Sequence, residues 1–179
     1  MKQLKYFFIF ALFTSMLSCI MDDTPPVFSV TPVEMTSVDS VYVFGEEIVP
    51  GKINPAFEYY VNSPDVQVRA CSGGYVIEIF LNENFPDYEI MIKPSINSAW
   101  LIVYDHVRNL NVTEGQYVNP ADVLGTVGVG ERTELQINDI SAGDGNDLSY
   151  CPFDFGTADF IQQHTNFTED WCLTNTVVP

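Results

Sequence analysis

Short apolar segments that alternate with polar residues recur along this chain, and Gly, Pro or Asn separates one segment from the next. Successive side chains of a β-strand point to opposite faces, so a two-residue period predicts half-buried strands rather than helices. Tyr75, Ile77, Ile79 and Leu81, for example, are expected on one face of a strand, with Glu78 on the other. The expected strands are Val27–Val33, Val41–Phe44, Val66–Ala70, Tyr75–Leu81, Tyr88–Ile92, Ala99–Tyr104, Val123–Val129 and Glu134–Asn138.

Strands that follow one another about every eight to twelve residues favour an all-β domain. We therefore predict a single domain over residues 27–179, an antiparallel β-sandwich or half-barrel. One short helix is expected near the C-terminus, over Thr157–His164, with Thr157 as its N-cap. The segments Pro50–Pro64 and Leu148–Pro179 are expected to be rich in loops.

Residues 1–18 have the features of an export signal. Lys2 and Lys5 give a positive start, and the apolar run Tyr6–Leu17 is too short to cross a membrane as a helix. We therefore expect an exported protein. A plain secretory signal and an ordinary buried N-terminal helix remain the alternatives to the lipoprotein signal considered next.

The small residue Ser18 directly precedes Cys19, which resembles the end of a bacterial lipoprotein signal. Cys19 would then be the lipidated first residue, and residues 19–26 would form a tether between the acyl chain and the domain. The expected location is the bacterial cell envelope, at the outer membrane or the cell surface.

Export also places the remaining cysteines in an oxidising compartment. Cys71 lies among expected strands, so we predict a disulfide between Cys151 and Cys172 that would contribute about 3 kcal/mol. Three free buried thiols are the alternative. The chain has no Cys-x-x-Cys motif, which argues against a thiol redox site or a cysteine zinc site.

The chain is strongly acidic, with 24 Asp and Glu against 7 Lys and Arg, for a net charge of −17. Loss of Lys2 and Lys5 with the leader would take the charge to −19. Nucleic acid and anionic membrane surfaces repel such a chain, so neither is an expected partner except through a lipid anchor. The charge favours a partner with a basic patch.

The segment Leu101–Val129 reads LIVYDHVRNLNVTEGQYVNPADVLGTVGV. It resembles the second half of the lysostaphin-like (LytM, M23-type) metallopeptidase domain, and an upstream motif in Pro64–Val76 extends the resemblance to about residues 50–156. The matching positions are Tyr104, Asp105, His106, Val112, Gly115, Val118, Leu124, Gly125, Val127 and Gly128, with Ala121 where the family usually has Gly. Gly115 and Gly125 are expected to permit positive φ at hairpin corners.

The catalytic half of the resemblance is missing. In the family, zinc is held by an early His-x-x-x-Asp motif and by the last His of a late His-x-His motif, and two further histidines assist the attacking water. The chain has only two histidines, and only His106 lies in a family position. Glu134 and Gln136 stand where the late histidines would be, and Asn54–Asp65, where the early motif would fall, contains no His.

The resemblance therefore implies no catalytic residue, no metal and no cofactor, and a binding groove near Tyr104, His106, Glu134 and Gln136. We expect a degenerate domain that binds, scaffolds or regulates cell-wall components or wall enzymes. Its expected partner is a cell-wall peptide or an envelope protein.

Other interpretations stay open. A zinc peptidase with altered ligands could draw on Glu58, Asp65, Glu134 and His106. A structural subunit of a surface complex needs no groove ligand, and an immunoglobulin-like sandwich is the alternative fold. Gly143–Asp147 invites a calcium-loop interpretation, but the ligand order of an EF-hand is absent, which favours a tight turn.

Overall fold

The computed structural model describes residues 21–143 and 147–179. The predicted export signal and Cys19 lie outside the described residues, as does most of the predicted turn at Gly143–Asp147. Among the residues that are described, helices are too short or too polar to cross a bilayer.

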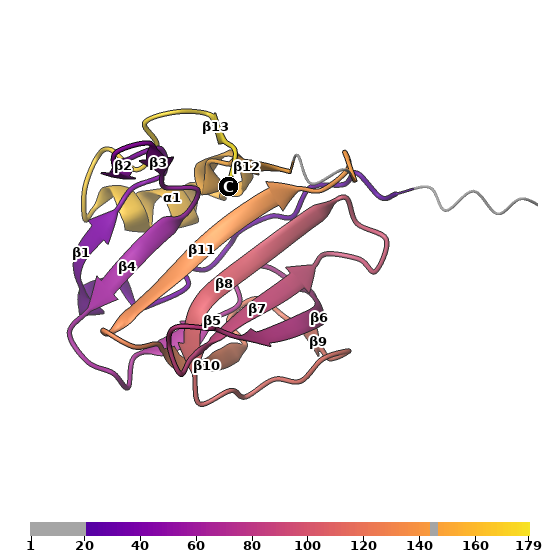
Figure 1. The fold of residues 1–179 in the computed structure, drawn as a ribbon, viewed down its shortest axis with the longest axis horizontal. Helices are drawn as coiled ribbons and strands as arrows, with labels where there is room; N and C mark the ends of the chain where they lie inside the picture. Colours follow the sequence, from indigo (N-terminus) through magenta and orange to yellow (C-terminus); the bar gives the residue numbers. More distant parts are fainter. Residues whose placement is uncertain (1–20, 144–146) are drawn as a thin grey trace, which may run out of the picture.

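One antiparallel sheet forms the body of the molecule (Figure 1). Along the sheet the strands are β1 (Val38–Tyr42), β4 (Phe57–Val61), β11 (Arg132–Asp139), β8 (Trp100–Arg108), β7 (Tyr88–Lys93), β6 (Gly74–Leu81) and β9 (Tyr117–Val118). The predicted antiparallel all-β fold with one short C-terminal helix is confirmed.

Shorter strands extend this sheet at its margins. They are β5 (Gln67–Arg69), β10 (Val123–Val127), β12 (Leu148–Tyr150) and β13 (Thr176–Val177). The strand β10 pairs with β5 and with the last residues of β8, while β12 pairs with β11 and β13. A separate hairpin consists of β2 (Glu47–Val49) and β3 (Lys52–Ile53).

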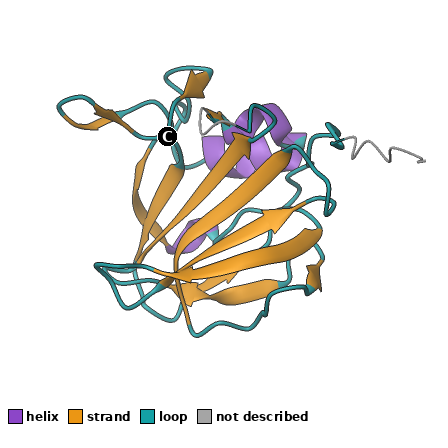
Figure 2. Cartoon of the chain, turned by 45° about the vertical axis from the view of Figure 1, so that its right-hand side comes forward, coloured by secondary structure: helices purple, strands orange, loops and turns teal. Residues whose placement is uncertain are grey.

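The helix α1 (Ala158–Thr165) begins as predicted at Thr157, whose Oγ1 accepts a hydrogen bond from the Phe160 amide at 3.3 Å. Two short 3-10 helices, η1 (Met35–Ser37) and η2 (Pro152–Phe155), complete the described secondary structure. In the views of Figures 1 and 2, α1 lies behind the strands. One face of the central sheet is therefore left without a helix.

The core lies between α1 and the covered face of the sheet. Phe57 and Tyr59 of β4 pack against His164 of α1 and against Trp171, and all four side chains are buried. His164 Nε2 lies 2.8 Å from the Tyr59 hydroxyl, and its Nδ1 lies 2.7 Å from the Phe160 carbonyl oxygen. Burial lowers the pKa of His164 to about 4, so this imidazole is neutral at physiological pH.

The structure corrects two strand assignments. The segment Pro50–Pro64, predicted to be loop-rich, contains β4, which lies between β1 and β11 in the sheet. The predicted strand Val27–Val33 is absent as a strand: this segment follows Pro25 and Pro26, and Phe28 forms only an isolated bridge to Gly156.

The alternation predicted for β6, with Tyr75, Ile77, Ile79 and Leu81 on one apolar face, is not observed. A register shift between Val76 and Glu78 in the pairing with β7 reverses the faces of the strand. Val76 is fully buried, whereas Ile77 and Leu81, expected on one face with Tyr75 and Ile79, are exposed.

Gly125 does not have the positive φ that was expected of it, although Gly115 does, at 81°. Gly125 instead lies against β8, and a Cβ there would lie 2.7 Å from Val107 Cγ1. Glycine suits this position because a side chain would not fit there, and not because the backbone angle is unusual.

The predicted disulfide between Cys151 and Cys172 is present, with the two Cα atoms 6.0 Å apart. Cys71 remains a free, buried thiol.

Near the start of the described chain, the Asp22 amide donates to the Asn97 carbonyl at 2.8 Å, and the Asp22 carbonyl accepts from the Ala99 amide at 2.7 Å. Asp22, within the expected tether, is thus fastened to the segment that leads into β8.

Candidate functional site

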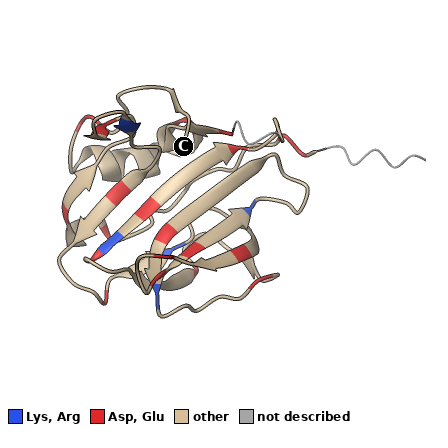
Figure 3. Cartoon of the chain, in the orientation of Figure 1, with Lys and Arg blue, Asp and Glu red and all other residues tan. Residues whose placement is uncertain are grey.

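Three carboxylates form a row across the uncovered face of the sheet. In the strand register, Glu134 of β11 lies opposite Glu58 of β4 on one side and opposite Asp105 of β8 on the other. Directly paired residues of an antiparallel sheet point to the same face. Figure 3 shows this row as a stripe of acidic positions that crosses neighbouring strands.

The alternation of β11 decides which of its residues belong to this face. Thr133 and Leu135 are fully buried towards the core, so Arg132, Glu134 and Gln136 point the other way. Two of the predicted site residues, Glu134 and Gln136, therefore lie on the uncovered face as neighbours along one strand.

His106 follows Asp105 at a kink of β8, where its backbone takes a left-handed φ of 55°. Its ring is buried, and its Nδ1 lies 3.0 Å from Oδ2 of Asp87. Asp87 is itself fully buried and also accepts hydrogen bonds from the Val129 amide at 2.9 Å and from Asn82 Nδ2 at 2.8 Å.

Asp87 determines the tautomer of His106. Burial acts to raise the pKa of Asp87, but the hydrogen bonds from Asn82, Val129 and His106 outweigh it and hold the pKa below its usual value. An ionised Asp87 can only accept, so we assign the imidazole proton to Nδ1. Nε2 is then left as an acceptor that faces the acidic row.

The turn between β10 and β11 closes over this pair. A Cβ at Gly128 would lie 2.7 Å from Cβ of His106 and would also clash with the Asp87 carboxylate. Only glycine permits this approach, which brings Val129 within hydrogen-bonding distance of Asp87.

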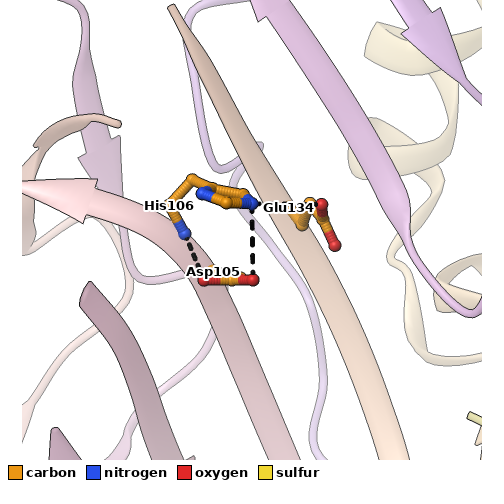
Figure 4. A group of neighbouring side chains, drawn as sticks. All are labelled: Asp105, His106 and Glu134. Carbon is orange, nitrogen blue, oxygen red and sulfur yellow. Dashed lines mark hydrogen bonds and ion pairs between the residues drawn. The ribbon is translucent and has the colours of Figure 1, made fainter. Parts of the chain in front are cut away.

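Nε2 of His106 lies 3.5 Å from Oδ2 of Asp105 and 3.7 Å from Oε1 of Glu134 (Figure 4). The three residues can each offer one atom to a common ligand, and these atoms lie within 4.8 Å of one another. Carboxylate oxygens and an imidazole nitrogen are donors that divalent metals accept.

Arg132 lies in the middle of this arrangement. Its NH1 atom is 2.7 Å from Oε1 of Glu58 and 3.9 Å from Oε1 of Glu134, and its NH2 atom contacts Nε2 of His106. The guanidinium also lies over the ring of Phe85, 5.5 Å from the ring centre.

Arg132 is the nearest positive group to Glu134, and Lys52 acts on this carboxyl more weakly. Burial, together with the neighbouring carboxylates Glu58 and Asp105, raises the pKa of Glu134 to about 8, and Arg132 offsets only part of the effect. Within the described chain, no hydrogen bond to the Glu134 side chain is present. The crowding of carboxylates in the row therefore favours the protonated form of Glu134 at neutral pH.

Tyr104 and Gln136 take no part in the cluster around His106. Tyr104 points into the core, where its hydroxyl accepts a hydrogen bond from the Cys71 amide at 2.6 Å. The Gln136 amide donates to Asn138 Oδ1 at 2.8 Å and to Ser149 Oγ at 3.1 Å. Asp65, considered as a metal ligand in the sequence, lies exposed in the turn before β5.

Sequence reasoning missed Asp87, Asp105 and Arg132. Arg132 lies two residues before Glu134, just outside the expected strand Glu134–Asn138, and an extension of that strand to the observed start would have put both residues on one face. Asp105 belongs to the Tyr104-Asp105-His106 motif, but its position opposite Glu134 depends on the register between β8 and β11. Nothing in the sequence links Asp87 to a histidine 19 residues away.

At the level of sequence, no protein-family model and no curated protein matches this chain. Solved structures do. The catalytic domain of the antimicrobial peptidase lysostaphin from Staphylococcus simulans is 18% identical, with a TM-score of 0.53, and the match covers 68% of this chain and 93% of that domain. Csd3 from Helicobacter pylori is 16% identical, with a TM-score of 0.54, over 79% of this chain.

The match spans 39% of the Csd3 chain and 53% of a full lysostaphin chain, so it concerns only part of each of those proteins. At these identities the likeness establishes the fold. This chain has the lysostaphin-like fold of the M23 peptidases.

Proposed function

We propose that this chain is a catalytically degenerate lysostaphin-like domain, lipid-anchored through Cys19 in the bacterial cell envelope, that binds a cell-wall peptide or an envelope protein with a basic patch. The observation that carries the proposal is the composition of the site. Glu134 and Gln136 occupy positions where the resemblance implies imidazoles, and the chain's other histidine, His164, is buried in the core.

The amide of Gln136 supports a binding rather than a catalytic role. Its two hydrogen-bond partners, Asn138 and Ser149, lie on the same sheet margin, and they hold the amide as part of the surface. A neutral amide cannot replace an imidazole as a strong zinc ligand or as a proton carrier. This face therefore presents fixed polar groups to a partner.

The charge of the uncovered face supports a basic partner. The row of Glu58, Glu134 and Asp105 continues towards Glu89 of β7, whose pKa is raised by burial and by the neighbouring Asp105 and Glu78. Carboxylates with raised pKa values gain from a positive charge brought beside them. The exposed rings of Phe80 and Phe85 offer apolar contact beside this row.

Attachment through Cys19 would fix how this face is presented. Asp22 is held against the segment that leads into β8, and only three peptide units separate it from Cys19, a span of at most about 11 Å. The start of β8 would then lie near the membrane surface. The acidic row lies about five residues further along β8, roughly 17 Å away along the strand.

The test is the binding of the full-length protein, purified in detergent, to purified peptidoglycan. We expect the wild type to bind and to release no peptide fragments. The double variant Glu134→Leu/Gln136→Leu should bind at least about tenfold more weakly, a loss of about 1.4 kcal/mol. The matched control Gln163→Leu/Glu169→Leu makes the same two changes at exposed positions in and after α1 and should bind as the wild type does. Equal binding by all three proteins would contradict the proposal.

A zinc peptidase with altered ligands is the alternative, and the convergence of Asp105, His106 and Glu134 is the observation that favours it. This function requires release of wall peptides that stops when a chelator is added and resumes with zinc. Such release by the wild type would replace the proposed binding role.

A further inference from the structure

We propose that Arg132 is a built-in cation that fills a potential divalent-metal site formed by Glu58, Asp105, His106 and Glu134, and that the guanidinium keeps metal out of this site. The inference goes beyond the proposed binding role, because it concerns what holds the face together when no partner is bound.

The first observation is that the guanidinium contacts acceptors from three strands. Through NH1 it reaches Glu58 of β4 at 2.7 Å and Glu134 of its own strand at 3.9 Å. Through NH2 it contacts Nε2 of His106 on β8. A single positive group thus bridges side chains from three strands. Two of these side chains, His106 and Glu134, belong with Asp105 to the group whose ligand atoms lie within 4.8 Å of one another.

The second observation is the orientation of His106. A histidine that binds a metal through one ring nitrogen commonly donates its other N–H to a carboxylate, which fixes the tautomer. Asp87 supplies such a carboxylate at 3.0 Å from Nδ1. Nε2 is directed at Asp105 and Glu134, 3.5 and 3.7 Å away, and Arg132 is the positive group that contacts it there.

The third observation is that Arg132 is held firmly. Its ring partner Phe85 also contacts His106, with the two rings 5.6 Å apart. Glu58, almost fully buried, accepts a second hydrogen bond from the Tyr60 hydroxyl at 2.7 Å. A divalent ion must displace a guanidinium that is both stacked and ion-paired, and it cannot share the space with that charge.

Removal of the guanidinium should therefore create a metal site. We expect Arg132→Met, which keeps side-chain bulk without charge, to bind Zn²⁺ at least about 100-fold more tightly than the wild type, a gain of about 2.7 kcal/mol. Equilibrium dialysis of the full-length protein against zinc measures this gain. Cobalt(II) serves as a second probe, because its visible spectrum reports ligand number and geometry.

Three further variants make the test specific. Arg108→Met removes an arginine that donates to the Val127 carbonyl instead, and it should bind no more zinc than the wild type. Arg132→Lys retains a positive charge and should continue to exclude zinc. Adding His106→Gln to Arg132→Met should abolish the gain, because it removes the imidazole ligand.

The result that overturns the inference is a folded Arg132→Met protein without gained zinc affinity, or a wild type that already binds zinc as tightly. If Arg132→Met is unfolded, recovery of its thermal transition on addition of zinc supports the inference, and failure to recover contradicts it. If the wild type binds zinc tightly and binds peptidoglycan without cleaving it, this inference is overturned and the proposed function stands. If the wild type binds zinc tightly and cleaves peptidoglycan, both are overturned.

Discussion

At the scale of single residues, Ala121 shows how closely the backbone follows the lysostaphin-like pattern. It occupies the position where the resemblance expects glycine, and its φ is 72°. Asn119 to Asp122 forms a turn in which the Asp122 amide donates to the Asn119 carbonyl at 3.1 Å, so Ala121 is the third residue of a turn that normally requires glycine there. Alanine thus occupies a turn position that glycine suits better.

Ala121→Gly should therefore stabilise the protein. Relief of the left-handed strain is worth about 1–2 kcal/mol, and the greater freedom of the unfolded chain removes part of it, for a net gain of about 0.5–1 kcal/mol. Urea unfolding measures the gain. The matched control is Gly115→Ala, at an exposed glycine with φ 81°, which should lose a similar amount. A destabilised Ala121→Gly protein would show that this turn carries no strain.

His164 predicts a dependence of stability on pH. Its pKa in the folded protein is lowered to about 4 by burial among aromatic rings, whereas in the unfolded chain it is about 6.5. Above pH 6.5 both states are neutral. As the pH falls from about 6.5 to 4, only the unfolded state takes up the proton, so stability declines by up to about 3 kcal/mol.

The measurement is the free energy of unfolding in urea between pH 7 and pH 4. In His164→Gln this contribution should disappear, so its unfolding free energy should fall less steeply with acidification than that of the wild type. Parallel pH profiles of the two proteins would mean that His164 titrates normally in the fold.

The site residues were only partly predictable at this scale. Three of the site residues, His106, Glu134 and Gln136, were identified from their places in a motif. In the structure His106 lies on β8, and Glu134 and Gln136 lie on the neighbouring strand β11. Tyr104 was assigned to the groove by the same motif, yet strand alternation directs it into the core. Asp87 and Arg132 belong to no motif, and their role depends on distances that only the folded register sets.

At the scale of secondary-structure elements, the strands with clear alternation or β-branched runs were predicted well. The range predicted for β7 differs from the observed strand by one residue, and β10 and β11 were each located within two residues. The failure was β4, because Pro55, Asn62 and Pro64 surround a strand of only five residues and resemble loop punctuation. Missing β4 also concealed the position of Glu58 beside Glu134.

The C-terminal segment after α1 depends on the disulfide. Cys172 pairs with Phe44 in an isolated bridge and is covalently joined to Cys151 at the start of η2. Replacement of both cysteines by alanine should lower the free energy of unfolding by about 3 kcal/mol, because the closed loop of about twenty residues then adds entropy to the unfolded state. Chemical denaturation tests this, and Cys71→Ala removes a buried thiol outside the bridge as the comparison. An unchanged stability of the double variant would show that packing of Trp171 alone holds the segment.

At the scale of the whole molecule, the surplus of acidic residues is organised rather than spread evenly. The uncovered face of the sheet carries Glu58, Glu134 and Asp105 in one row, and Arg132 is the cation held among them. A face of this kind should attract a basic partner over distances comparable to the screening length of the solution.

Partner binding should accordingly weaken with salt. Binding of the full-length protein to purified peptidoglycan, or to an isolated basic envelope partner, is expected to fall several-fold between about 0.05 and 0.3 M NaCl. At pH 9, where a Glu134 carboxyl with a pKa of about 8 is ionised, the variant Glu134→Gln should show a shallower dependence than the wild type. Salt-independent binding would place recognition on the exposed Phe80 and Phe85 rather than on the acidic row.

The central claim is that the uncovered face of this lysostaphin-like fold holds an internal arginine where a peptidase needs a metal. The most direct test is the zinc content and zinc affinity of the wild-type protein, purified without chelator. The account predicts no stoichiometric zinc and only weak, exchangeable binding. One tightly held zinc per chain, lost in His106→Gln and Glu134→Gln, would contradict it.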